Sequence, residues 1–451
     1  MRVALVVPRA SLVTEDRPYA RLWEGLAEVQ ARRRLWSAPH LGLLTVAGLL
    51  PAGVEVSYLD EGLRPLEMDD PYDLVLLSPV THQAPRAYEL AWEFARRGSQ
   101  VVVGGVHASV LPEEALEWTP AVAVGEAEAL WPRLWEDIVH RRARGVYRAE
   151  GWADLTASPA PRYDLVAPAD YRSAPIQVSR GCPHGCEFCA TSRLFGPRYR
   201  RKSLGQVLRE VEAATAVWGR PFLFFTDDNM FLDRRFSREL VSALRGYRLR
   251  WSAFSDISLA RDRELLRLAA RAGLSQVLIG FESLDARNLR GLDRRGFKAR
   301  RLKDYADAVH RIQAEGVGVV GSFVLGLDHD TPDTFRRIRD FVLENALYAT
   351  NLTVATPFPG TALHRRLKAE GRLTERGWRE YTGFQATFTP RGMSLEELEA
   401  GLAWLYQEIN RPEAIERRLL RLKALAGERL DRCAAAQAGP EAGGEGPPDG
   451  A

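Results

Sequence analysis

Three of the four cysteines in this chain lie close together, in the segment GCPHGCEFC. Cys182, Cys186 and Cys189 follow the spacing C-x3-C-x2-C. Thiolates are soft ligands that suit iron–sulfur clusters and zinc. A closed zinc site takes four ligands, and four ligands within this one segment, His184 included, would strain a tetrahedral shell. The trio therefore favours a 4Fe–4S cluster with three irons held by cysteine and one open to a small molecule. Zinc or inert thiols are the alternatives.

The fourth cysteine does not complete a conventional cluster site. Ferredoxin clusters take four cysteines at a different spacing. Cys433 lies next to the low-complexity end AAAQAGPEAGGEGPPDGA. We therefore treat Cys433 as incidental.

Composition narrows the class of protein. Lys and Arg number 62 against 59 Asp and Glu, a net charge of +3, which is too balanced to indicate nucleic-acid binding. The longest apolar runs are interrupted by glycine and are shorter than the ~18 residues of a membrane span. The first residues lack a signal-peptide cleavage site. Few cysteines, mostly clustered, suit a reducing compartment, so we expect a soluble cytoplasmic protein.

Residues 1–150 alternate short apolar runs with helical patterns. The runs are apolar on both faces, which is typical of parallel strands covered by helices. The alternation predicts an α/β domain of the Rossmann-like type. The expected strands are residues 3–8, 54–60, 73–79, 100–105 and 121–126, and the expected helices are 41–50, 85–97, 112–118 and 128–140.

A second set of strand–helix units follows a proline-containing linker at 151–174. Six units over 175–390 predict a partial (β/α)6 barrel of the TIM type. Residues 391–433 are predicted to be helical, and 434–451 to form a disordered tail. The expected strands begin at residues 176, 222, 250, 276, 319 and 352, and the expected helices are 203–218, 234–245, 262–272, 299–315 and 332–344.

The cysteine trio falls just after the first of these strands, where the active residues of parallel α/β sheets gather. This arrangement resembles the radical S-adenosylmethionine (SAM) superfamily. In that family the open iron chelates SAM, one electron from the cluster cleaves the sulfonium, and the resulting 5′-deoxyadenosyl radical abstracts hydrogen from an unactivated carbon. The cofactors carry the hard step and the protein orients them. The resemblance places Phe188, directly before the third cysteine, beside the adenine.

The resemblance also assigns polar residues to SAM. The segment FTDDN ends the second barrel strand, where the family binds the SAM amino group, so that role falls to Asp227, Asp228 or Asn229 without a choice among them. A helix N-cap turn is the alternative. Glu282 ends the fourth strand and is the expected contact to the ribose or methionine end, because a carboxylate at an apolar strand end needs a partner. No residue is assigned a catalytic role.

The first domain resembles the cobalamin (B12)-binding domain that precedes the barrel in one radical SAM subgroup. The resemblance rests on residues 78–91, 104–116 and 121–128. Glycines at strand ends let the backbone approach a large planar cofactor, so Ser78, Gly104 and Gly105 are the predicted contacts. The D-x-H-x-x-G string that supplies a cobalt-binding histidine in many cobalamin proteins is absent. Neither His40 nor His107 is given that role, so cobalamin binds without a protein histidine or the pocket is vestigial.

The resemblance implies a cobalamin-dependent radical SAM enzyme, with C-methylation as the leading reaction. Similarity to hopanoid-methylase-like members points to a small isoprenoid or lipid substrate. The expected partners are that substrate and an electron donor such as flavodoxin or ferredoxin. The basic stretch 417–432 suggests peripheral membrane contact, with a solvated helix face as the alternative. A radical SAM cyclase or rearrangement enzyme with cobalamin and a non-catalytic cluster-binding protein are the alternative functions.

Overall fold

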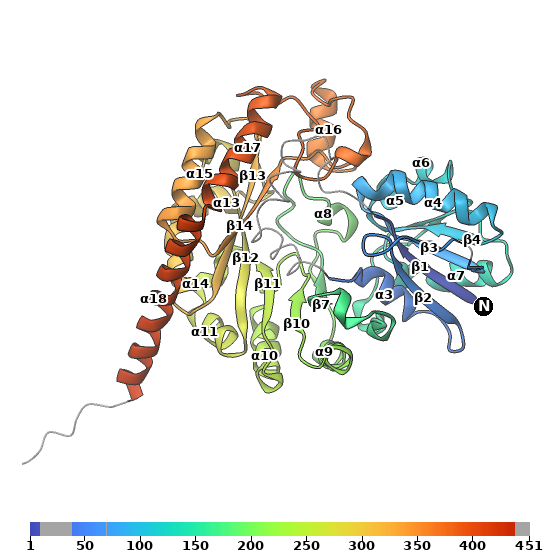
Figure 1. Cartoon of the computed structure of the whole chain (residues 1–451), viewed down its shortest axis with the longest axis horizontal. Helices are drawn as coiled ribbons and strands as arrows, with labels where there is room; N and C mark the ends of the chain where they lie inside the picture. The colour runs from blue at the N-terminus through green and yellow to red at the C-terminus, as the bar shows by residue number, and fades with distance from the viewer. Residues whose placement is uncertain (10–37, 69, 438–451) are drawn as a thin grey trace, which may run out of the picture.

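The computed structural model describes residues 1–9, 38–68 and 70–437, and two parallel sheets organise them (Figure 1). Each sheet has six strands. The first belongs to the N-terminal domain, and the second curves through the larger domain that follows it. Within the described residues, no helix is both long and apolar enough to cross a membrane.

The N-terminal domain is a three-layer α/β sandwich, as the alternation of strands and helices predicts. Its strand order is β2-β1-β3-β4-β5-β6, all parallel. Helices α4 to α6 cover one face of the sheet and α3 and α7 the other. The strands are β1 (Arg2–Val7), β2 (Glu55–Asp60), β3 (Leu74–Leu77), β4 (Gln100–Val103), β5 (Ala121–Val124) and β6 (Gly145–Arg148), and the helices are α3 (Leu41–Ala47), α4 (Ala84–Arg96), α5 (Gly105–Val110), α6 (Pro112–Leu116) and α7 (Ala127–Val139).

The second sheet is an open half-barrel with the order β14-β13-β12-β11-β10-β7, which confirms the partial barrel. Its end strands β7 and β14 do not pair with each other, and helices pack along its outside (Figure 1). The strands are β7 (Ser173–Ile176), β10 (Phe222–Phe225), β11 (Trp251–Ser255), β12 (Leu274–Glu282), β13 (Gly318–Leu325) and β14 (Ala349–Val354), and the main helices are α9 (Leu204–Trp218), α10 (Arg234–Leu244), α11 (Arg263–Arg271), α14 (Tyr305–Gln313), α15 (Asp333–Glu344), α16 (Ala362–Ala369), α17 (Leu395–Ile409) and α18 (Pro412–Gln437).

Short elements lie at the edge of the half-barrel where its strands end. Strands β8 (Ser179–Arg180) and β9 (Arg200–Arg201) pair antiparallel and flank the cysteine segment. Helix α8 (Thr191–Leu194) follows the third cysteine. The remaining short helices are α12 (Ala286–Leu289), α13 (Phe297–Arg301) and the 3-10 turn η8 (Trp378–Glu380).

Several predicted boundaries differ from the structure. The first barrel strand was expected to begin at Ile176, but β7 ends there and includes Pro175. Proline is tolerated because β7 is an edge strand. The helix expected over 299–315 is divided into α13, a 3-10 turn and α14. Helix α18 continues through Gln437, and the remainder of the expected tail, 438–451, lies outside the described residues.

Candidate functional site

The cysteine segment crosses the edge of the half-barrel where the strands end, between β8 and α8. Cys182, Cys186 and Cys189 are half-buried and form no disulfide. The loop turns sharply at Gly181, where φ is +92° and a side chain would overlap the Arg198 carbonyl oxygen. Within the described chain, no three His, Cys, Asp or Glu side chains converge on a single ion position. Ligands to three different irons of one cluster do not need to converge in this way.

Burial raises the pKa of these thiols. The pKa of Cys182 rises to about 11 and that of Cys186 to about 12, and burial raises the pKa of Cys189 as well. Metals bind the thiolate, so metal binding here must displace firmly held protons. Cluster assembly on this loop is therefore expected to favour alkaline solution.

His184 lies inside the loop, but its ring faces a carboxylate. His184 Nε2 is 2.9 Å from Asp256 Oδ2, and Asn229 Nδ2 donates to the same oxygen at 2.7 Å. Asp256 is 7% exposed and follows β11. Burial raises its pKa, but the hydrogen bonds from His184 and Ser258 outweigh burial, so the pKa of Asp256 is lowered. Asn229 therefore helps to fix the Asp256 carboxylate, which in turn holds the His184 ring of the cysteine loop.

The two aspartates of the FTDDN segment have different environments. Asp227 is fully buried and accepts hydrogen bonds from Val178 N at 3.1 Å and from Ser179 N and Oγ, both at 2.5 Å. Burial raises the pKa of Asp227 to about 6. Its oxygens are engaged in holding the chain just before the cysteines. Asp228 is half-buried and accepts from Thr191 Oγ1 at 2.9 Å, beside the third cysteine.

Glu282 ends β12 in an unusual conformation. Its φ is +65°, and the register between β12 and β13 shifts at this point. Lys298 Nζ lies 2.9 Å from Glu282 Oε1 and donates to the Gly280 carbonyl at 2.7 Å. Burial lowers the pKa of Lys298, but the charges of Glu282, Cys186 and Tyr305, with the Glu282 hydrogen bond, together outweigh burial and raise it. Lys298 was not anticipated, although a buried carboxylate implies a partner.

Phe188 is half-buried and packs against the main hydrophobic core of the half-barrel. It stands between Cys186 and Cys189 in the loop, so its ring is held close to the thiols by the chain itself.

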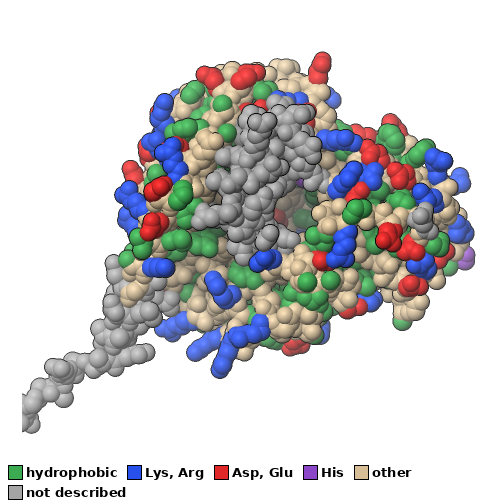
Figure 2. All heavy atoms as spheres, viewed as in Figure 1, with side chains coloured by type: hydrophobic (Ala, Val, Ile, Leu, Met, Phe, Trp, Pro, Cys, Tyr) green, Lys and Arg blue, Asp and Glu red, His purple; other side chains and the backbone are tan. Residues whose placement is uncertain are grey.

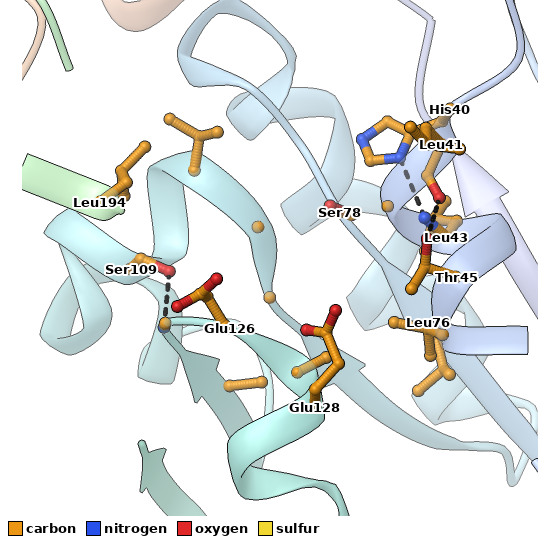
Figure 3. Close-up of a pocket in the computed structure, with 18 of the residues that line it drawn as sticks. His40, Leu41, Leu43, Thr45, Leu76, Ser78, Ser109, Glu126, Glu128 and Leu194 are labelled. Atoms are coloured by element: carbon orange, nitrogen blue, oxygen red, sulfur yellow. Dashed lines mark hydrogen bonds between the residues drawn. The ribbon is translucent and has the colours of Figure 1, made fainter. Parts of the chain in front are cut away.

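A cavity of about 510 Å³ lies between the two sheets (Figure 3). Leu76 and Val102 of the first sheet, with Leu130, Trp131 and Leu134 of α7, form its apolar wall. Residues of the half-barrel side, including Gln177, Arg180, Leu194, Phe224 and Thr226, close the opposite side. The cavity therefore lies at the interface between the two domains.

The predicted contacts of the first domain gather at this cavity. Ser78, Gly104 and Gly105 all line it. Gly105 has φ +78°, and a Cβ there would overlap Ser78, so glycine is required for this close approach. His40 also lines the cavity, but its Nδ1 accepts from Leu43 N at 3.1 Å and caps α3 (Figure 3). His107 is buried and its ring packs against Tyr88 of α4, on the opposite face of the sheet.

Sequence reasoning missed a buried ion-pair network beside the cavity. Arg180 Nη1 lies 2.8 Å from Glu126 Oε1, and Arg180 Nη2 lies 2.8 Å from Glu128 Oε1. Arg200 Nη1 is 3.0 Å from Glu126 Oε2. Glu126 and Glu128 follow β5, whereas Arg180 lies two residues before Cys182. The network ties the cavity wall to the start of the cysteine loop.

Comparison with known protein families agrees with this architecture. Residues 176–342 match the radical SAM superfamily, and residues 36–134 match the B12 binding domain. Residues 361–437 match a domain of unknown function, DUF4070.

Curated relatives extend over most of the chain. An uncharacterized methyltransferase of Synechocystis is 31% identical over 362 residues, 78% of this chain and 67% of that protein. The bacteriochlorophyllide d C-12(1)-methyltransferase of Chlorobaculum tepidum is 28% identical over 388 residues, 84% of each chain. The hopanoid C-2 methylase of Rhodopseudomonas palustris is 27% identical over 353 residues, 76% of this chain and 66% of that protein.

A solved structure shares the fold. The radical SAM methyltransferase TsrM from Kitasatospora setae, solved with cobalamin and a 4Fe–4S cluster bound, has a TM-score of 0.66 at 18% identity. The match covers 92% of this chain and 90% of that chain.

This chain belongs to the radical SAM superfamily, in the group that carries a B12-binding domain and includes methyltransferases. Its cofactors are a 4Fe–4S cluster, SAM and cobalamin. The residues fit these groups in chemical type. Three half-buried thiols on one loop suit three corners of a cluster. The cavity combines an apolar wall with a glycine edge, which suits a large cofactor that is only partly polar.

Proposed function

We propose that this enzyme transfers a methyl group to an unactivated carbon of a largely apolar small molecule, of the isoprenoid, lipid or tetrapyrrole class. The observation that carries the proposal is that the cavity lies between the B12-binding domain and the half-barrel. One wall consists of residues of the B12-binding domain, and the opposite wall includes Arg180, two residues before the first cysteine of the loop. Methyl transfer requires both cofactors beside one substrate. The hopanoid and bacteriochlorophyllide relatives support an apolar substrate.

Each residue of the site has a role in this proposal. Cys182, Cys186 and Cys189 hold three corners of the cluster. When bound, the cluster, SAM and cobalamin together supply hydrogen abstraction and a transferable methyl group. We assign Asp228 and Glu282 to the polar end of SAM. Asn229 positions the loop through Asp256 and His184.

Other side chains shape the surroundings of the cofactors. Phe188 packs beside the adenine and excludes water from the loop. Ser78, Gly104 and Gly105 shape the contact to cobalamin. His40 is engaged as a helix cap, which supports cobalamin binding without a histidine ligand from the protein.

The test is anaerobic purification followed by reduction in the presence of SAM and cobalamin. We expect about four irons and four sulfides per chain, formation of 5′-deoxyadenosine, and a product heavier by one methylene when an apolar substrate such as a hopanoid or bacteriochlorophyllide is supplied. Cys186→Ala should lose the cluster, whereas Cys433→Ala should retain it. About one zinc without sulfide would refute the proposal, and a product that lacks a new methyl group would indicate a cyclase or rearrangement enzyme.

Radical SAM enzymes need a reductant, and we propose a flavodoxin or ferredoxin for this one. The peripheral membrane contact suggested for residues 417–432 has less support. Arg418 is 2% exposed and donates to the carbonyls of Leu347 and Ile409, so it helps to dock α18 on the half-barrel. Leu419 and Leu420 are exposed apolar residues of this stretch that could touch a membrane surface. Vesicle flotation with and without Leu420→Glu would test that contact.

A further inference from the structure

The segment 285–304, which follows β12, is strongly basic. It contains eight Lys and Arg against three Asp, a net charge of +5, whereas the whole chain carries only +3. It includes α12 and α13 and the turn between them. Most of these Lys and Arg side chains are not neutralised by carboxylates among the described residues.

The acidic residues of the segment are already engaged. Asp285 pairs with Arg287 at 2.7 Å, and Asp304 with Arg301 at 3.2 Å. Asp293 is buried, and its carboxylate accepts from the backbone N–H groups of residues 295, 297 and 298. Lys298 is buried against Glu282 and does not contribute to the surface.

The remaining cations form an exposed cluster, which we call the basic patch. None of them has a carboxylate partner among the described residues. The Arg300 side chain donates to the backbone carbonyl of Arg295, which holds the Arg300 guanidinium close to residue 295. The basic patch consists of Arg290, Arg294, Arg295, Arg300 and Lys303, all of them exposed.

The basic patch is attached directly to the cysteine loop. Arg294 N donates to the His184 carbonyl at 2.9 Å, and Glu187 N donates to the Leu292 carbonyl at 3.0 Å. Gly185 has φ +61°, and a side chain there would meet the Arg294 side chain at 2.6 Å. The backbone between Cys182 and Cys189 is thus in contact with the chain that presents the cations.

We propose that the basic patch is the docking surface for a small acidic electron-carrier protein that reduces the cluster. This inference rests on the proposed function, because it places the cluster on the cysteine loop. One electron leaves the reduced centre of the carrier, which is oxidised by one electron, and enters the cluster, with no bond made or broken. Electron transfer slows steeply with distance, so the carrier must dock close to this loop.

The charge of the basic patch suits such a carrier. Electron-transfer encounters use small interfaces and dissociate quickly. Complementary charge then raises the association rate and orients the partner, and this effect weakens with added salt. Exposed, unpaired arginines beside the loop provide that charge.

The test compares two double variants with equal change of charge. Arg290→Glu with Arg295→Glu removes two cations of the basic patch. Arg245→Glu with Arg271→Glu is the matched control. Arg245 and Arg271 are exposed, lack a carboxylate partner among the described residues, and lie together at the opposite edge of the half-barrel, where its strands begin. Figure 2 shows Lys and Arg side chains along that edge, near α10 and α11.

Binding of oxidised flavodoxin to the anaerobic protein is measured by calorimetry at low and high salt, and cluster reduction by reduced flavodoxin is followed by stopped-flow absorbance. We expect R290E/R295E to weaken binding and slow reduction by about 10-fold or more at low salt, with the difference shrinking at high salt. Reduction by dithionite should be unchanged. The R245E/R271E control should stay within about 2-fold of the wild type.

Unchanged binding by R290E/R295E, or equal losses in both double variants, would overturn the docking surface. Failure of the wild-type protein to form 5′-deoxyadenosine with dithionite would instead refute the proposed function. The calorimetric comparison would still decide whether the basic patch binds the carrier.

Discussion

Glu282 is a non-glycine residue in the left-handed backbone region, at the end of the largely buried strand β12. This conformation costs about 1–3 kcal/mol and persists only where the surroundings enforce it. Here the surroundings are Lys298, which bridges Glu282 and the Gly280 carbonyl. A Cβ on Gly280 would overlap the Glu282 carboxylate. The strand end is therefore built to present this carboxylate near the cysteine loop.

Replacing Glu282 tests how much the Glu282–Lys298 ion pair contributes to the stability of the fold. Glu282→Gln leaves the Lys298 ammonium buried without its counter-charge. Because breaking a buried pair on one side costs about 3–5 kcal/mol, the thermal midpoint should fall by several degrees. Glu282→Gln with Lys298→Met should recover much of the loss by removing the stranded charge. A single variant as stable as the wild type would show that solvent already screens Lys298.

At the scale of elements, the sequence predicted those helices and strands whose ends and burial depend on residues close together in the chain. Ser203 caps α9 with a reciprocal Gln206 bond, and Gly219 ends it at φ +72°, which confirms the helix predicted over 203–218. Strand β6 was missed, since its four residues GVYR include only one fully buried side chain, Tyr147. Pro175 concealed the start of β7, because its tolerance depends on an edge position that only the sheet order reveals.

The candidate site was predictable only where its signals come from residues close together in the sequence. The cysteine spacing and the glycine strand ends are local signals, and they identified the loop and the cavity. The partners of Asp227, Glu128 and Glu282 lie 48, 52 and 16 residues away in sequence, at Ser179, Arg180 and Lys298. No spacing rule specifies these partners. The different environments of Asp227 and Asp228 therefore appear only in the three-dimensional structure.

The Arg180 network is the element-scale link between the two domains, and Arg180→Met tests it. The change leaves the buried Glu128 carboxylate without its cationic partner. Burial raises the pKa of Glu128, but the hydrogen bonds from Arg180 outweigh burial and lower the pKa overall. We expect a loss of about 3–5 kcal/mol in stability and weaker retention of cobalamin, because Glu128 and Arg180 both line the cavity. Calorimetry and the cobalamin absorbance after gel filtration measure the two effects.

Arg201→Met provides the control for that prediction. Arg201 lies on the adjacent short strand β9 and pairs with Asp233 at 3.2 Å in an exposed position. An exposed pair contributes about 0–1 kcal/mol. Equal losses from Arg180→Met and Arg201→Met would mean that the buried network has no special part in joining the domains.

At the scale of the whole molecule, the chain returns to its first domain near its C-terminal end. The 3-10 turn η8 reaches back over α4 and α6 of the B12-binding domain. Trp378 Nε1 donates to Glu114 Oε2 at 2.9 Å, while Glu114 Oε1 lies 3.1 Å from His107 Nε2. Arg379 and Glu89 form a further ion pair in the same contact. This is a second contact between the domains, in addition to the Arg180 network.

The pKa of Glu114 makes this contact sensitive to acid. Burial raises that pKa, but hydrogen bonds from His107 and Trp378 outweigh burial and lower it overall; the Tyr88 hydroxyl also faces the carboxylate. A carboxyl group with a depressed folded pKa stabilises the fold above its unfolded pKa of about 4.3. The stabilisation is lost as the pH falls from that value through the folded pKa.

Glu114→Gln should therefore lower the thermal midpoint at pH 7, and the difference from the wild type should shrink steadily as the pH falls below about 4.3. Trp378→Phe removes the indole N–H and part of the ring but leaves the Glu114 carboxylate and its contact with His107, so it should give a smaller loss at pH 7. Limited proteolysis between the domains should accelerate in both variants if the contact keeps them closed. A midpoint difference that stays constant with pH would show that Glu114 stabilises the contact by shape, without its charge.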